Sequence, residues 1–83
     1  MEIKVFGPGC ARCKEAENVV YEAATLAGGG INVVKVTDFR EIMAARIIST
    51  PAVMVDGVVK STGRVPTGDE VAQWIAEAAA ATA

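Results

Sequence analysis

The two cysteines of this chain, Cys10 and Cys13, lie where an apolar strand-like run gives way to a helical pattern. Residues 3–6 form the apolar run, and Gly7-Pro8-Gly9 interrupts it directly before the first cysteine. The first turn of a helix has unpaired N–H groups and a partial positive charge, and both stabilise a thiolate over a thiol. The two-residue spacing lets the second sulfur reach the first. The junction therefore predicts a strand–turn–helix unit that presents a pair of thiols.

The composition is that of one small domain, and we expect residues 1–83 to form it. A hydrophobic content of 52% supports a core, and a charged content of 22% argues against disorder. A net charge of -2 without a basic cluster gives no indication of a nucleic-acid partner. No apolar run approaches the length of a membrane span, and the N-terminus lacks signal-peptide features. We therefore expect a cytoplasmic protein, in which a C-x-x-C pair is more often catalytic or metal-binding than a permanent bridge.

Helix and strand signals alternate in the first half of the chain. An apolar stripe at helical spacing predicts a helix over residues 10–27 with Cys13 on its buried side, and the glycine run from Gly28 ends it. Residues 31–36 indicate a second strand. Because a helix separates the two strands, we expect them to be parallel, with a right-handed connection.

A second helix is predicted over residues 39–48, with Asp38 and Glu41 as its capping box. Thr50-Pro51 ends it, because the residue before a proline avoids helical backbone angles. The apolar residues expected on its buried side are Phe39, Ile42, Met43 and Ile47.

Two strands and a last helix complete the predicted fold. Asp56-Gly57 joins residues 52–55 and 58–61 as a tight hairpin, and a second capping box, Thr67 with Glu70, begins the last helix. The order β-α-β-α-β-β-α predicts an α/β fold, in which a four-stranded mixed sheet is flanked by three helices.

This chain resembles the thioredoxin-like superfamily in its smallest form, and it is similar to the small redox-active disulfide proteins, also called archaeal-type or atypical thioredoxins. The resemblance implies the minimal thioredoxin-like fold, without the extra N-terminal strand and helix of ordinary thioredoxins. The segments that carry it, in the family's order, are Gly7-Pro8-Gly9-Cys10-Ala11-Arg12-Cys13, Ser49-Thr50-Pro51-Ala52, Val55-Asp56-Gly57-Val58 and Gly63-Arg64-Val65-Pro66-Thr67.

The two cysteines are predicted to have different roles. Cys10 begins the helix beside a loop, so it should be the accessible nucleophile. Cys13 lies on the buried stripe and should resolve the mixed disulfide. The resemblance assigns the same roles and implies a redox-active Cys10–Cys13 disulfide with no bound cofactor. For Arg12 and Lys14 two interpretations stay open: they lower a thiol pKa, or they are solvated surface cations.

The resemblance also implies substrate-binding or site-supporting positions around the thiols. Pro51 would be cis and pack against the cysteine pair, with Thr50 offering its backbone to an extended substrate; from the residues alone, an ordinary trans proline would be the simpler reading. Gly9 stands where ordinary thioredoxins have a tryptophan, so that aromatic surface is missing. Ala11 and Arg12 separate the cysteines. No residue could be matched to the buried aspartate that accepts a proton in ordinary thioredoxins.

The function that these features predict is thiol–disulfide oxidoreduction. The protein would be a monomer that reduces disulfides in client proteins and is recharged by an NADPH-linked thioredoxin reductase. One alternative is a module that shares zinc or an iron–sulfur cluster across a dimer, since one chain has two cysteines and no histidine. Another is a redox-sensing interaction module without catalysis. Glutaredoxin activity is disfavoured because C-P-Y-C and the paired glycines after the hairpin are absent.

Overall fold

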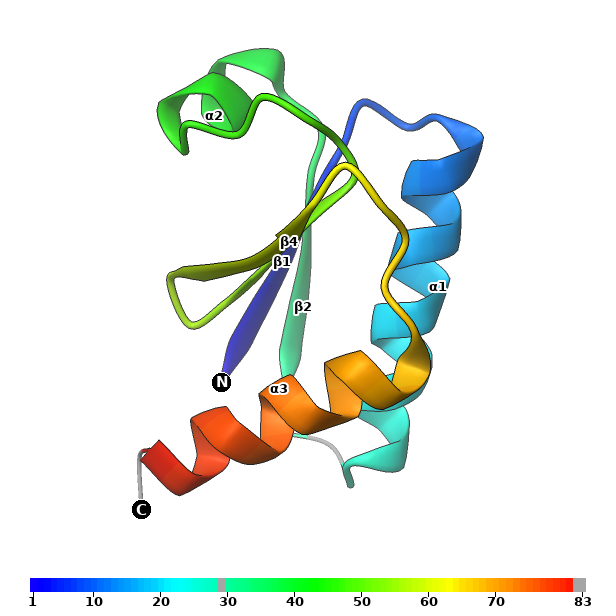
Figure 1. Cartoon of the computed structure of the whole chain (residues 1–83), viewed down its shortest axis with the longest axis vertical. Helices are drawn as coiled ribbons and strands as arrows, with labels where there is room; N and C mark the ends of the chain where they lie inside the picture. The colour runs from blue at the N-terminus through cyan, green and yellow to red at the C-terminus, as the bar shows by residue number, and fades with distance from the viewer. Residues whose placement is uncertain (29, 82–83) are drawn as a thin grey trace.

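The computed structural model describes residues 1–28 and 30–81, which form four strands and three helices in the predicted order (Figure 1). The elements are β1 (Glu2–Phe6), α1 (Ala11–Leu26), β2 (Asn32–Val36), α2 (Phe39–Ala44), β3 (Ala52–Val55), β4 (Val58–Thr62) and α3 (Gly68–Ala81).

The four strands form one mixed sheet in the order β2-β1-β3-β4. β1 pairs in parallel with β2, as predicted for strands joined by a helix, and β3 pairs antiparallel with β4, as predicted for a hairpin. β3 also pairs antiparallel with β1, which joins the hairpin to the rest of the sheet. The register places Phe6 opposite both Val36 and Ala52. Consequently β1 and β2 end, and β3 begins, at the same edge of the sheet.

Helices α1 and α3 cover one face of the sheet (Figure 1). Side chains alternate between the two faces of a strand, so Ile3 and Val5 of β1 both point toward these helices and are buried. Trp74 of α3 packs partly buried against this core. The buried members of the cluster are Ile3, Val5, Ala16, Val20, Ala23, Val53, Val55, Val71 and Ile75.

Helix α2 lies over the opposite face, and it is shorter than predicted. It ends at Ala44 because the chain reverses through Arg46, whose φ is 61°. The N–H of Arg46 donates to the Met43 carbonyl at 2.9 Å, and the N–H of Ile47 donates to the Ile42 carbonyl at 3.2 Å, the pattern of a Schellman cap. The prediction that the helix continues to Ile48 was therefore wrong.

The burial predicted for α2 was only half correct. Ile42 and Ile47 pack into a second core cluster with Phe6, Val36 and Ala52. Phe39 and Met43, also predicted to be buried, are 72% and 59% exposed. A single turn and a half of helix presents one narrow stripe to the sheet, and Ile42 occupies it.

The hairpin and the cap of α3 follow the predicted turn chemistry. Asp56 and Gly57 have positive φ values of 46° and 84°, as a tight two-residue turn requires. The pairing of β3 with β4 breaks between Val53 and Met54, which pair with Ser61 and Val59, so Lys60 is an extra, bulged residue.

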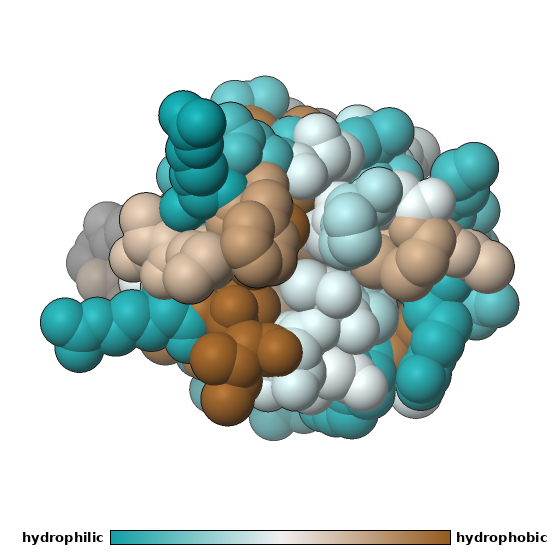
Figure 2. All heavy atoms as spheres, turned by 90° about the horizontal axis from the view of Figure 1, so that it is seen from above, coloured by the Kyte–Doolittle hydropathy of each residue, from teal (hydrophilic) through white to brown (hydrophobic). Residues whose placement is uncertain are grey.

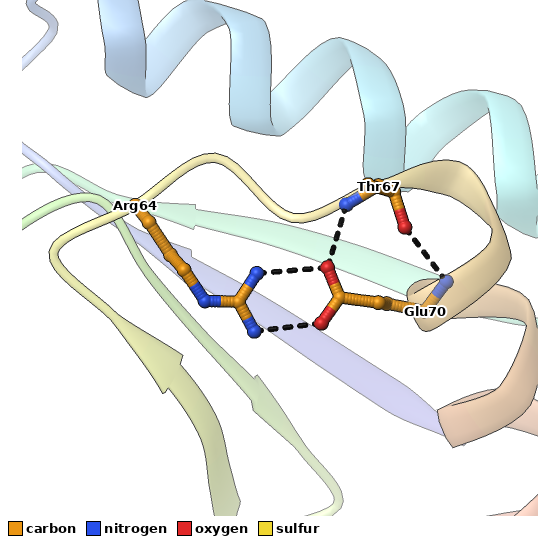
Figure 3. Close-up of polar contacts among 3 residues, drawn as sticks. All are labelled: Arg64, Thr67 and Glu70. Atoms are coloured by element: carbon orange, nitrogen blue, oxygen red, sulfur yellow. Dashed lines mark hydrogen bonds and ion pairs between the residues drawn. The ribbon is translucent and has the colours of Figure 1, made fainter.

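The capping box of α3 is complete, and a third residue extends it (Figure 3). The Thr67 N–H donates to Glu70 Oε1 at 3.0 Å, and the Glu70 N–H donates to Thr67 Oγ1 at 3.1 Å. The Arg64 guanidinium donates to both oxygens of Glu70, at 2.8 and 2.7 Å. These bonds lower the pKa of Glu70 to about 2, with the Arg64 hydrogen bonds as the largest cause. The loop from β4 is thereby fastened to α3.

Candidate active site

Cys10 and Cys13 lie at the start of α1, at the sheet edge where β1 ends. Cys10 is the N-cap residue, with extended backbone angles, and its carbonyl accepts the N–H of Lys14 at 3.0 Å. Its side chain is exposed, whereas that of Cys13, one turn into the helix, is 1% exposed. The structure therefore brings the two predicted cysteines together and exposes only one of them.

The two sulfurs are hydrogen-bonded, with Sγ–Sγ 2.8 Å, and both thiols are unlinked. This hydrogen bond is the largest cause that lowers the pKa of Cys10, and the backbone N–H of Cys13 adds to it. Burial is the largest cause that raises the pKa of Cys13, followed by the same hydrogen bond. Since a hydrogen bond to the charged form favours it, Cys10 ionises first and the Cys13 thiol donates to its thiolate.

Gly7, for which the sequence predicts only a tight turn, is a residue of the site. It is buried, and its N–H donates to the Val36 carbonyl at 2.9 Å. A Cβ at Gly7 would lie 2.8 Å from Cys13 Cβ and closer still to Cys13 Sγ. The space that a side chain would fill is therefore occupied by the buried thiol. No sequence signal marks this, because the contact joins a strand end to a helix turn.

The Thr50-Pro51 segment reaches the same edge of the sheet, because Ala52 pairs with Phe6. The Thr50-Pro51 peptide bond is cis, as the resemblance implied. Pro51 is buried, and its carbonyl accepts the N–H of Gly63 at 2.9 Å. Gly63 has φ +73°, and a Cβ there would lie 3.1 Å from Ser49 Cβ. The β4–α3 loop thus packs directly behind this segment.

The remaining predicted site residues are on the surface around Cys10. Gly9 is exposed and has φ +96°, a conformation that suits glycine. Ala11 and Arg12, between the cysteines, are exposed, and so is Lys14. The leading causes of the Cys10 pKa shift are hydrogen bonds rather than attraction by Arg12 or Lys14. This favours the interpretation of Arg12 and Lys14 as surface cations.

A buried carboxylate that the sequence analysis did not find lies one turn after Cys13. Glu17 of α1 is buried, and its Oε2 lies 3.6 Å from the Nζ of Lys35 on β2. The helical pattern of the sequence led to no prediction of burial for Glu17. The carboxylate is enclosed because α1 docks beside β2.

Over residues 1–28 and 30–81, no group of three or more His, Cys, Asp or Glu side chains is placed to bind a metal ion. In the same residues, no helix is long and apolar enough to span a membrane.

The fold and the paired thiols are those of a thioredoxin-like protein with a C-x-x-C pair. Residues 1–76 match the model of the thioredoxin domain, and the chain belongs to that family. It is 36% identical over 69 residues to a thioredoxin of Methanocaldococcus jannaschii, which covers 83% of this chain and 79% of that protein. It is 32% identical over 71 residues to a thioredoxin of Methanothermobacter thermautotrophicus, which covers 86% of this chain and 92% of that protein. This relationship and the cysteine pair suggest a thiol–disulfide redox protein.

Proposed function

We propose that this protein is a disulfide reductase for client proteins, with Cys10 as nucleophile and Cys13 as resolving thiol. The observation that carries the proposal is the asymmetry of the pair. The sulfurs are 2.8 Å apart, yet Cys10 is exposed with a lowered pKa and Cys13 is buried with a raised one. Attack needs an accessible thiolate, and resolution needs a thiol that stays protonated until the mixed disulfide forms.

The proposed reaction has two exchanges. The Cys10 thiolate attacks one sulfur of the client disulfide, and the other client sulfur leaves as a thiolate that takes up a proton. Cys13 then loses its proton and attacks Cys10 Sγ, which breaks the mixed disulfide and releases the second client thiolate. Two electrons pass to the client, and the protein becomes the Cys10–Cys13 disulfide. An NADPH-linked thioredoxin reductase would return the two electrons.

The loops around Cys10 would hold the client. Over residues 1–28 and 30–81, neither the N–H nor the C=O of Thr50 has a hydrogen-bond partner, and the residue is half-buried. Unpaired backbone groups beside a sheet can accept an extended segment as an added strand. Gly9, Ala11 and Arg12 would contact the same segment, because they surround Cys10 on the surface.

A trapping experiment tests the assignment of the two cysteines. Cys13→Ser should accumulate a mixed disulfide through Cys10 with a peptide that contains one intramolecular disulfide, measured by intact mass. Cys10→Ser should form no adduct under the same conditions. An adduct only with Cys10→Ser would reverse the roles, and no adduct with either variant would contradict disulfide reduction. NADPH consumption with a purified thioredoxin reductase separately tests the recharging step.

A further inference from the structure

Three large apolar side chains are exposed on α2 and in the loop that follows it. Phe39, Met43 and Ile48 are 72%, 59% and 99% exposed, and we call them the α2 patch. Phe39 and Met43 are four residues apart, so they lie on one side of the helix. Figure 2 shows hydrophobic side chains gathered on this end of the molecule. Exposure of apolar surface to water is unfavourable in proportion to its area, so a partner that buried these side chains would gain binding free energy.

The α2 patch lies at the same end of the sheet as Cys10 (Figure 1). β1 leads to Cys10 and β2 leads to α2, and these strands are parallel with Phe6 paired to Val36. The Gly7 N–H donates to the Val36 carbonyl, and this hydrogen bond holds the end of β1 beside the end of β2. Ile48 lies four residues before Ala52, where β3 begins at this edge. The α2 patch and the exposed thiol therefore lie at one end of the sheet, where a single extended client segment could contact both.

Cations flank the α2 patch. Arg40 and Arg46 are exposed, and neither makes an ion pair with any of residues 1–28 and 30–81. Two carboxylates belong to the same segment. Asp38 accepts the Arg40 backbone N–H at 2.9 Å as the cap of α2. Glu41 is exposed and next to Arg40 in sequence, but it is two residues from both Phe39 and Met43 and so lies on the opposite side of α2 from the patch. Across the end of the sheet, the start of α1 contributes two further exposed cations without an ion pair in the described chain. These are Arg12 and Lys14.

We propose that the α2 patch is a specificity surface for client segments in which apolar side chains are flanked by carboxylates. Its apolar residues would bury the client's apolar side chains, while Arg40 and Arg46 would attract the flanking carboxylates. The docked segment would place its disulfide against Cys10. This inference rests on the proposed disulfide reduction and adds the class of client to it.

Three peptides of equal length, each with one intramolecular disulfide, test the proposal. The first carries Leu and Phe with flanking Glu, the second carries Leu and Phe with flanking Lys, and the third carries Ser with flanking Glu. We expect kcat/KM for the first to exceed both others by roughly tenfold, since exposed ion pairs and an aromatic contact each contribute severalfold factors. Raising the salt concentration should reduce the advantage over the Lys peptide and leave the Ser peptide comparison largely unchanged.

Matched variants assign the effect to the patch. Phe39→Ser with Met43→Gln should remove the preference for Leu and Phe, and Arg40→Gln with Arg46→Asn should remove the preference for Glu and its salt dependence. Leu26→Ser is the control, because Leu26 is 82% exposed at the far end of α1. All variants should turn over a small aromatic disulfide at the wild-type rate, since that substrate is too small to reach α2.

Three outcomes would overturn the proposal. Equal kcat/KM for the three peptides would remove the specificity surface and leave disulfide reduction standing. Failure to reduce any peptide or the small disulfide would overturn the proposed function, and the client surface with it. A dimer in sedimentation that Phe39→Ser with Met43→Gln dissociates would show that the patch binds a second copy of the chain instead.

Discussion

Replacement of Gly7 by alanine tests how tightly the sheet end holds the buried thiol. The new Cβ would lie 2.8 Å from Cys13 Cβ and closer to Cys13 Sγ, whereas the Gly7 backbone is outside the left-handed region and accepts alanine. The cost is therefore one of overpacking, about 1–3 kcal/mol. For a domain of this size, each kcal/mol lowers the midpoint of thermal unfolding by about 4–8 °C.

The assay is urea unfolding of the reduced protein, followed through the fluorescence of Trp74, the one tryptophan of the chain. Gly68→Ala is the matched control: nothing lies within 4 Å of a Cβ at Gly68, and its backbone is also outside the left-handed region. That control should be neutral or stabilise the protein by about 0.4–1 kcal/mol.

A double-mutant cycle locates the clash. Cys13→Ala removes Sγ, so Gly7→Ala should cost less in that background than in the wild type, with part of the cost remaining from Cys13 Cβ. In the active protein, displacement of Cys13 should also slow closure of the Cys10–Cys13 disulfide. A Gly7→Ala change within about 0.5 kcal/mol of zero, or an identical cost in both backgrounds, would refute the close approach of Gly7 to the thiol.

Three further predictions follow from the hydrogen bonds and turns. Cys10 should be alkylated with a midpoint below that of an ordinary thiol, and Cys13→Ala should raise this midpoint because it removes the largest cause of the lowered pKa; an unchanged midpoint would contradict that cause. The pKa of Glu70 is lowered to about 2, so its charged form stabilises the fold above pH 4.5 and that contribution is lost as the pH falls toward 2. The stability difference between wild type and Glu70→Gln, measured by urea unfolding, should therefore shrink over this range, and a constant difference would argue against the Arg64 pairing. Gly57→Ala should lose about 1–2 kcal/mol of unfolding free energy, since φ is +84° there, and a neutral result would mean that the turn relaxes.

The parts of the fold that could be predicted are those that depend on residues close together in the sequence. The capping box of Thr67 and Glu70, the Asp56-Gly57 hairpin and the position of the cysteine pair at a strand–helix junction each depend on residues a few positions apart. Such signals survive folding because the groups that satisfy one another are already close in the chain. The cis state of Thr50-Pro51 came from the family resemblance, and the residues alone favoured trans.

The parts that could not be predicted depend on contacts between elements. Phe39 and Met43 share the helical period of Ile42, but the short α2 buries only one stripe, and its end is set by the reversal at Arg46. The burial of Glu17 requires the docking of α1 beside Lys35 of β2. The role of Gly7 likewise depends on a contact between elements, because the Cys13 thiol of α1 occupies the space that a side chain at Gly7 would need.

The bulge at Lys60 has a consequence for how copies of this chain meet in concentrated solution. β4 is an outer strand, and its far side presents backbone groups that could pair with a strand of another molecule. The extra residue interrupts the regular spacing of those groups, and it places an exposed ammonium on the rim. A second chain that approached edge to edge would meet a broken ladder and, from a like copy, a like charge. The bulge and the charge both disfavour fibre-like stacking along this side of the molecule.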